Sequence, residues 1–240
     1  MPNTGTLSGL SAATAYVLDA VHVDATGNIS NVETSEPFTT ATAPATQIVY
    51  EGAGDLGTGI SATVANGVST AGFHVLCVFN DDPNTTPATV TFSGASPDGV
   101  VSSANGQGGN VELHHIANAA PGDIAITTID ASRAKSYALY RLTGFTAAGL
   151  ISADDEGQGP ITLGSVPDGA AILVAGGAAS GSGAGLPVIA ATDTIQDGGH
   201  AGFPALTVNS GTKAGAGSVT ASLTGGANRF GLVGLAFPVA

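Results

Sequence analysis

The segment GAGDLG at residues 52–57 is the first candidate for chemistry. It satisfies the G-x-G-x-x-G spacing with which a dinucleotide-binding loop brings its backbone close to a pyrophosphate. The residues that follow, TGISATVANG, are rich in glycine and β-branched side chains instead of helix formers. No acidic residue stands about 20 positions further on to bind a ribose. We therefore expect a flexible glycine-rich loop here and no bound cofactor.

The adjacent pair His114 and His115 is a second candidate, because imidazoles are common metal ligands. Neighbouring residues on a strand point to opposite faces, so the two could share one metal ion only across a bulge. His115 shares a face with Val111 and Leu113, whereas His114 shares a face with Glu112. We expect a core histidine beside an exposed one and no metal site. The other histidines are far apart in the sequence and show no ligand spacing: His22, His74 and His200.

Two carboxylate clusters could supply oxygen ligands to Ca²⁺ or Mg²⁺. They are Asp81 with Asp82 in FNDDPN, and Asp154, Asp155 and Glu156 in ADDEGQG. Neither matches an EF-hand loop, so we expect solvated turns, with DDEGQG the better candidate for a structural ion. Paired carboxylates could also hydrolyse a glycoside, but that chemistry requires a groove and a defined separation between them.

Nucleophilic catalysis has little support in this sequence. Cys77 is the single cysteine and lies within FHVLCVF, where both faces of a strand would be mostly apolar. This pattern favours a buried, inert thiol that cannot form an intramolecular disulfide. There is no G-x-S-x-G elbow. We expect no enzyme activity, no catalytic residues and no cofactor, and the sequence leaves any binding residues unknown.

The composition indicates the elements that would position such residues. The 240 residues include 36 Gly and 12 Pro, with many Val, Thr and Ser residues. Glycine and proline break helices, while β-branched side chains fit a pleated surface. No apolar run approaches the roughly 18 residues that a membrane-spanning helix needs. We predict an all-β fold with no membrane insertion.

Charge limits the partners. Five basic residues against 18 acidic residues give a formal net charge of −13, which repels phosphate backbones. We therefore expect no nucleic-acid partner. The start of the sequence has no basic segment followed by an apolar stretch, so we expect no secretory signal.

Residues 1–42 contain a short, family-specific pattern. A leucine and a tyrosine precede a D-x-x-G-N-x-S turn between two predicted strands, the first over 16–23 and the second ending near residue 38. The residues that carry this pattern are Leu10, Tyr16, Asp24, Gly27, Asn28 and Ser30. The segment resembles the C-terminal half of a fibronectin type III domain, in which a corner tyrosine ties its hydroxyl to the preceding loop.

The fibronectin-like segment covers less than half of a module of that family, which needs roughly 90 to 100 residues. We expect it to be completed by another subunit, to dock on the second domain, or to be the remnant of a longer fibre. An Ala/Thr/Pro-rich linker follows at 43–46. The incomplete sandwich favours a homo-oligomer, such as a trimer.

Residues 47–240 predict a jelly-roll-like antiparallel β-sandwich of about ten to twelve strands, with Pro, Asp and Gly turns between them. No repeat of fixed period is evident. The predicted strands are 47–51, 60–64, 73–79, 88–92, 111–116, 124–129, 137–142, 171–175, 206–209, 219–223 and 230–239.

This larger part resembles a domain of bacteriophage tail, fibre and surface-exposed virion proteins. The resemblance rests on a central apolar strand, a T-V-T-F-x-G strand, the run VELHHIANAAPG, and a late glycine-rich apolar strand. These lie at 73–79, 90–94, 111–122 and 171–177. The resemblance implies a virion location, on the tail rather than the capsid surface.

The function we expect is that of a structural or adhesion component of a tailed-phage particle, a tail fibre or tail-tip protein contacting other virion proteins and a host surface glycan or protein. The alternatives are a head decoration or head-fibre protein, and a cellular carbohydrate-binding or adhesion module. Contacts would come from loops on a rigid scaffold. The candidate loops are NDDPNTTP, SPDGVVSSANGQGG and GGAASGSGAG, of which the last, at residues 176–185, is expected to be mobile.

Overall fold

The computed structural model divides the chain into two compact units, Met1–Ala45 and Thr46–Ala240, and each is described by itself. The structure describes residues 14–20, 26–27, 33–39, 45–81, 87–103, 109–128, 134–155, 159–179, 186–202, 204–224 and 230–240. All regular structure within these ranges is β-strand, which confirms the all-β prediction.

The described part of the first unit is a ladder of short antiparallel strands. β1 pairs with β4, and β2 pairs with β3. Their bounds are Ala15–Tyr16 for β1, Asp19–Ala20 for β2, Glu33–Thr34 for β3 and Phe38–Thr39 for β4. Tyr16, the expected corner tyrosine, stacks on Phe38 across the ladder with ring centroids 6.2 Å apart. Of the other family residues, only Gly27 lies within the described ranges, and its positive φ of 87° suits a turn.

The second unit contains the same eight-stranded arrangement twice. Strands β5 to β12 form a five-stranded sheet in the order β5-β12-β7-β10-β9 and a three-stranded sheet in the order β6-β11-β8. Their bounds are Gln47–Gly57, Ser61–Val68, Gly72–Asn80, Thr89–Phe92, Gly99–Ser102, Asn110–Ala119, Gly122–Thr127 and Lys135–Thr143.

Strands β13 to β20 repeat this order as β13-β20-β15-β18-β17 and β14-β19-β16, strand for strand. Their bounds are Ile151–Asp155, Ile161–Val166, Ala171–Ala178, Val188–Ala191, Ile195–His200, Ala205–Thr212, Gly217–Thr224 and Phe230–Phe237. All pairings are antiparallel. The expected jelly-roll-like sandwich is therefore confirmed, and there are two of them in tandem.

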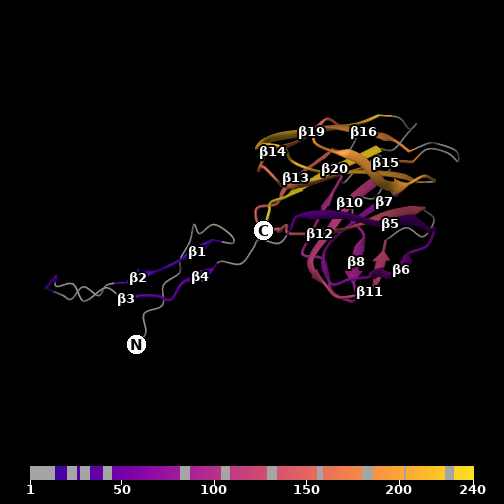
Figure 1. Ribbon diagram of the computed structural model, residues 1–240. Helices are drawn as coiled ribbons and strands as arrows, with labels where there is room; N and C mark the ends of the chain where they lie inside the picture. The colour runs from indigo at the N-terminus through magenta and orange to yellow at the C-terminus, as the bar shows by residue number, and fades with distance from the viewer. Residues whose placement is uncertain are drawn as a thin grey trace. The chain divides into compact units, whose positions relative to one another are not determined.

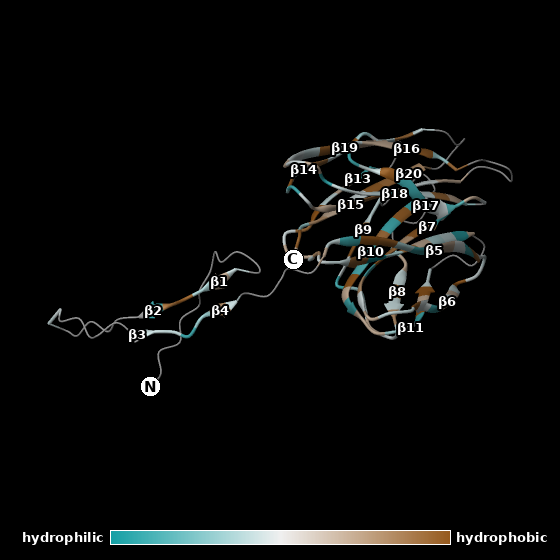
Figure 2. Ribbon diagram, viewed as in Figure 1, coloured by the Kyte–Doolittle hydropathy of each residue, from teal (hydrophilic) through white to brown (hydrophobic). Residues whose placement is uncertain are grey.

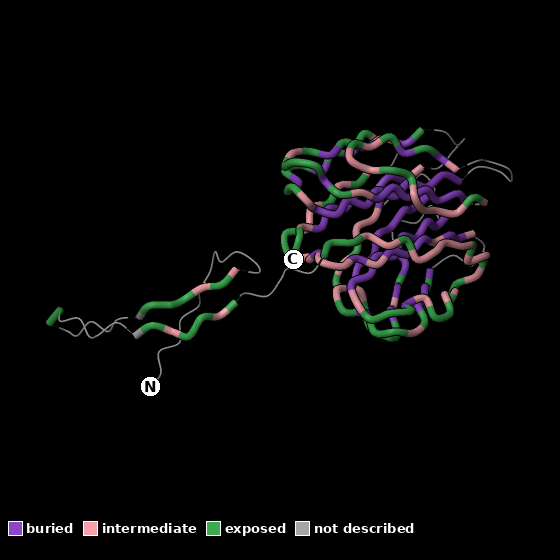
Figure 3. Tube along the Cα trace, viewed as in Figure 1, coloured by how far each residue is buried: buried purple, intermediate pink, exposed green. Residues whose placement is uncertain are grey.

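The two jelly rolls share one central core. Their five-stranded sheets pack face to face, and the three-stranded sheets cover the outer faces, which gives four layers (Figure 1). Buried residues run through both middle sheets (Figure 3), and long hydrophobic stretches lie on the same strands (Figure 2). Because each middle sheet is covered on both faces, strands such as β7 and β15 are mostly apolar on both faces.

Strand β7 shows how this arrangement follows from the sequence. Phe73, Val75, Cys77 and Phe79 enter the central core, whereas the alternate Leu76 and Val78 enter the core of the first jelly roll. In β15, Gly177 permits close packing of the two halves, since a Cβ there would lie 2.5 Å from the Phe79 ring. The two jelly rolls are thus held together by a buried cluster of side chains from both halves.

Candidate functional site

The GAGDLG segment is part of a strand, so the expected flexible loop was wrong. Residues 52–57 form the second half of β5 and pair along β12. Gly54 leaves room for the Tyr137 ring, because a Cβ there would lie 3.0 Å from it, which is a tight contact. Glycine at this position therefore accommodates a neighbouring side chain. The strand-turn-helix context of a dinucleotide site is not present in the described residues around it.

Both histidines of the adjacent pair are buried, so the expectation that His114 is exposed was wrong. His114 is 1% exposed and His115 is 5% exposed, on opposite faces of β10. The reason is that β10 lies in a middle sheet with a layer on each side. His115 packs between Phe73 and Phe237 in the central core, with ring centroids 6.3 and 5.7 Å away.

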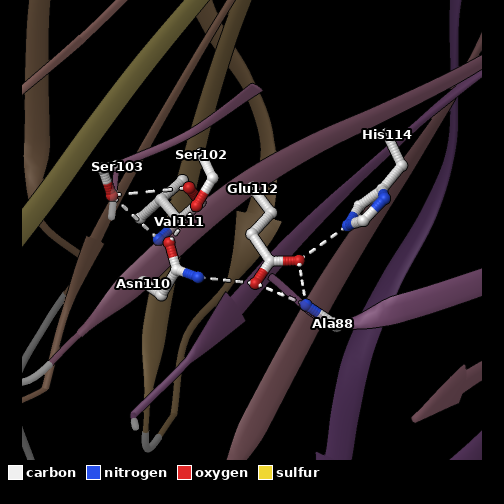
Figure 4. Close-up of polar contacts among 7 residues, drawn as sticks. All are labelled: Ala88, Ser102, Ser103, Asn110, Val111, Glu112 and His114. Carbon is white, nitrogen blue, oxygen red and sulfur yellow. Dashed lines mark hydrogen bonds and ion pairs between the residues drawn. The ribbon is translucent and has the colours of Figure 1, made fainter. Parts of the chain in front are cut away.

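His114 belongs to a buried polar network around Glu112, which is completely buried (Figure 4). Both Glu112 oxygens accept from the Ala88 N–H at 3.0 Å, and Oε1 also accepts from Asn110 Nδ2 at 2.7 Å. Nε2 of His114 lies 2.6 Å from Oε2. Because a carboxylate oxygen accepts, this nitrogen carries the proton. The network ties the residue before β8 to β10, and Asn110, Glu112 and His114 are at most 1% exposed, which indicates a structural role.

The structure describes the two carboxylate clusters only in part. Asp81 is 2% exposed, so the expected solvated turn was wrong for this residue, and Asp82 lies outside the described residues. Asp154 and Asp155 end β13, where Asp155 Oδ2 accepts from the Gly159 N–H at 2.8 Å. Glu156 also lies outside the described ranges. Within those ranges, no three His, Cys, Asp or Glu side chains gather as metal ligands would.

Cys77 is fully buried in the central core, as expected. Burial raises the pKa of the Cys77 thiol, which keeps it protonated and unreactive at neutral pH.

A pocket of about 200 Å³ lies between the two sheets of the first jelly roll, on the side where β5 and β6 are the edge strands. We take this pocket, called the β5–β6 pocket, as the candidate functional site. Its lining residues come from β5, β12 and the segment from β6 to Ser69: Glu51, Gly52, Val64, Ala65, Asn66, Gly67, Ser69, Tyr137 and Leu139.

Glu51 and Gly52 enter this pocket at a β-bulge in β5. Leu139 pairs with Gly52 and Tyr140 pairs with Tyr50, so Glu51 is the extra residue of β5. Gly52 has a φ of 149°, which side chains rarely adopt. Ile48 and Tyr50 lie on the face of the central core, so ordinary alternation puts Glu51 on the face between the two sheets, and the bulge adds Gly52 to that same face.

Two basic side chains on the same sheet face, those of Arg141 and His74, lie beside the Glu51 carboxylate. Arg141 Nε donates to Oε1 at 3.0 Å, and His74 Nε2 lies 3.3 Å from Oε2 without hydrogen-bond geometry. His74 Nδ1 lies 3.1 Å from the Gly72 carbonyl, which can only accept, so Nδ1 carries a proton. Arg141 neutralises the carboxylate and leaves Oε1 with a second acceptor position.

The β5–β6 pocket combines an anionic acceptor with an aromatic ring and small polar groups. Tyr137 supplies a ring and a hydroxyl, Asn66 an amide, and Ser69 a hydroxyl. Asn66 is fixed by its own N–H, which donates to Asp123 Oδ1 at 2.8 Å, and it adopts a positive φ of 50°. Among the described residues that line the pocket, Glu51 is the one carboxylate, whereas glycoside hydrolysis uses two. The arrangement can bind a small polar molecule.

The sequence patterns did not reveal this site. One signal was present: Glu51 and Arg141 are isolated opposite charges in otherwise apolar strand segments, IVYEGAG and YALYRLT. Such charges on neighbouring strands are expected to pair. The bulge that brings Gly52 to the same face as Glu51 depends on the pairing of β5 with β12 and has no sequence signature of its own.

The expected contact loops lie partly outside the described residues, at 82–86, 104–108 and 180–185. The start of GGAASGSGAG was predicted wrongly as a mobile loop, because residues 176–178 are the buried end of β15. The glycines there are needed for packing.

No helix in the described part of the chain has the length and apolarity to cross a bilayer. Comparison with family models, with curated proteins and with solved structures finds no match for this chain.

Proposed function

We propose that this chain is a non-enzymatic structural protein of a tailed-phage particle that displays a rigid double jelly roll for contact with the host surface. The observation that carries the proposal is the central core shared by the two jelly rolls. Such a core makes one stiff body of two domains, whereas domains joined only by a linker move independently.

The packing of the described residues supports a displayed scaffold. Side chains from both halves, such as Phe79 and Phe237, are fully buried in the same cluster. The fully buried Glu112 accepts hydrogen bonds from the Ala88 N–H and from Asn110 Nδ2. A rigid β scaffold that presents loops is a common way to build a contact surface.

The first unit is suited to attachment. A two-stranded antiparallel ladder is marginally stable by itself. Val17 and Leu18 in this unit are 53% and 42% exposed, although both are apolar. We propose that other particle proteins, or copies of the same chain in a symmetric oligomer, cover these side chains. The resemblance of residues 1–42 to the C-terminal half of a fibronectin type III domain, which leaves a sandwich incomplete, supports this role.

The net charge of −13 supports an exposed position in a protein present in many copies. Like charges keep neighbouring copies soluble and repel nucleic acid. A second candidate function, a carbohydrate-binding or adhesion module of a cell, is favoured by one observation, the β5–β6 pocket with its mixed aromatic and polar lining.

Immunogold labelling of purified particles that carry this chain tests the proposal. We expect gold at the tail fibre or tail tip. Label on the head would instead assign the chain to capsid decoration. Particles without label, from a strain whose lysate contains the chain, would overturn a virion role and favour the cellular module.

A further inference from the structure

We propose that the β5–β6 pocket binds a single neutral sugar ring. The pocket is preformed by the backbone. Gly52 bends β5 at the bulge, and on the facing strand the ladder of β6 with β11 is interrupted between the Val68 and Val64 pairs. Two irregular edges thus lie opposite each other, and a ligand would not have to open the sandwich to enter.

The size of the pocket selects a small ligand. Pockets for drug-sized molecules have volumes of roughly 300–1,000 Å³. About 200 Å³ is enough for one ring and its substituents and excludes a larger fused system. Gly52, where nothing lies within 4 Å of a Cβ, and Ala65 keep part of the wall free of bulky side chains.

The lining matches a polyhydroxylated ring. The Tyr137 ring offers an apolar face for the C–H groups of a sugar, and Glu51 Oε1 retains an acceptor position for a hydroxyl. Asn66 and Ser69, both exposed, offer donors and acceptors at the rim. Bonds to a charged acceptor are stronger than neutral ones, so Glu51 would dominate the affinity.

The charges argue against an ionic ligand. An acidic sugar would meet Glu51 and a chain of net charge −13. A cation would compete with Arg141, whose Nε already donates to Glu51 at 3.0 Å. A neutral sugar ring would form hydrogen bonds with the lining residues without displacing Arg141 from Glu51. With a single carboxylate in the lining, the pocket binds the sugar without cleaving it.

The test is a titration of the full-length protein with glucose, galactose, mannose and N-acetylglucosamine, followed by amide chemical shifts. We expect a dissociation constant on the order of 1 mM for one ring. Shifts should be confined to the amides around Gly52, Asn66 and Tyr137. The absence of shifts up to about 100 mM, or shifts elsewhere, would overturn the proposal.

Matched variants assign the contacts. Glu51→Gln should weaken binding about tenfold or more, because a charge-assisted hydrogen bond is lost. Glu36→Gln, an exposed residue of the first unit, removes the same charge and should leave binding unchanged. Undiminished affinity in Glu51→Gln would contradict the proposal, as would preferential binding of ethylammonium over every sugar.

Further variants guard against a folding defect in Glu51→Gln. Asn66→Gly keeps the positive φ and removes only the amide, so it should weaken binding in a folded protein. Tyr137→Phe keeps the ring and should bind within a few-fold of the original, whereas Tyr137→Leu should not bind. Equal binding by the Phe and Leu variants would exclude stacking. The outcome of the sugar titrations does not depend on the immunogold result, because a protein at any location can contain a sugar-binding site.

Discussion

Tyr140 in the first jelly roll donates a hydrogen bond of 2.9 Å to Asp197 in the second. Tyr140 is completely buried, and Asp197 also accepts from the Ser210 hydroxyl on the neighbouring strand. Burial raises the pKa of Tyr140, so its hydroxyl remains a donor at every physiological pH. This bond is a directional polar contact at the edge of an otherwise apolar interface, and it fixes how β12 and β17 are aligned.

Replacing Tyr140 with Phe tests the contribution of this bond. The ring is kept, so the packing with Tyr50, at 5.4 Å between centroids, is preserved. Asp197 loses one of its two donors. We expect the free energy of unfolding to fall by about 1–3 kcal/mol, the range for a hydrogen bond to a charged group. Urea unfolding followed by circular dichroism measures the change.

A double-mutant cycle with Asp197→Ala serves as the control for Tyr140→Phe. We expect a coupling energy between the two sites of about 0.5–3 kcal/mol, as for residues in direct contact. Additive effects would mean that the two side chains do not interact in solution.

The close approach of the two jelly rolls predicts a steep penalty for one methyl group. A Cβ at Gly177 would lie 2.5 Å from Phe79 and 2.8 Å from Val111. Gly177→Ala should therefore cost about 1–3 kcal/mol, as overpacking of a core does. Gly164→Ala is the matched control, since nothing lies within 4 Å of a Cβ there. That substitution should change stability by less than about 0.5 kcal/mol. Similar melting temperatures for both variants would contradict this packing.

The Glu112 network predicts that a single substitution will be costly and hard to compensate. Glu112→Ala leaves the Ala88 N–H, Asn110 and His114 without their acceptor. We expect a loss of about 3–5 kcal/mol, as when one partner of a buried ion pair is removed. Adding His114→Ala should recover little stability, because the backbone N–H and the amide remain unpaired. Thermal unfolding of both variants measures this, and full recovery in the double variant would contradict the network.

Alternation of apolar residues was enough to predict the central strands. FHVLCVF and AILVA are apolar on both faces, and both became middle strands covered by two layers. The strands that the sequence did not predict are short or weakly apolar: β9, β13, β14, β16 and β17. In β9, β13 and β17 no residue is fully buried, and Ser, Asp and Gly interrupt the apolar residues, so the sequence resembles a loop. Their pairing depends on contacts distant in sequence.

The duplication of the jelly roll could not be recognised from the residues. The two halves share strand order but not residue type at equivalent positions: β7 reads GFHVLCVFN and its counterpart β15 reads AILVAGGA. Large side chains in one half are matched by glycines in the other, as Phe79 is by Gly177. Because a large side chain on one half packs against a glycine on the other, the two sequences differ at such positions, and a comparison of residue types does not detect the repeat.

The shared core predicts that neither half is stable alone. A chain of residues 46–149 would expose Phe73, Phe79 and Leu113, which are at most 6% exposed in the whole unit. We expect this half to aggregate or self-associate, since a large exposed apolar face favours association. Residues 150–240 should rescue it as a 1:1 complex when both are produced together. Light scattering measures the mass, and a stable monomer of residues 46–149 would contradict the shared core.

His115 predicts that the protein loses stability in mild acid. Burial lowers the pKa of His115, which nearby His114 also lowers while Asp98 raises it. The unfolded state, with a pKa near 6.5, then takes up a proton more readily than the folded state. The contribution of His115 is therefore complete above about pH 6.5 and is lost as the pH falls below that value. His115→Leu, which keeps an apolar side chain beside Phe237, should flatten this pH dependence, whereas His200→Gln should not. Urea unfolding between about pH 5 and pH 8 measures both profiles. An unchanged slope in His115→Leu would show that another group takes up the proton.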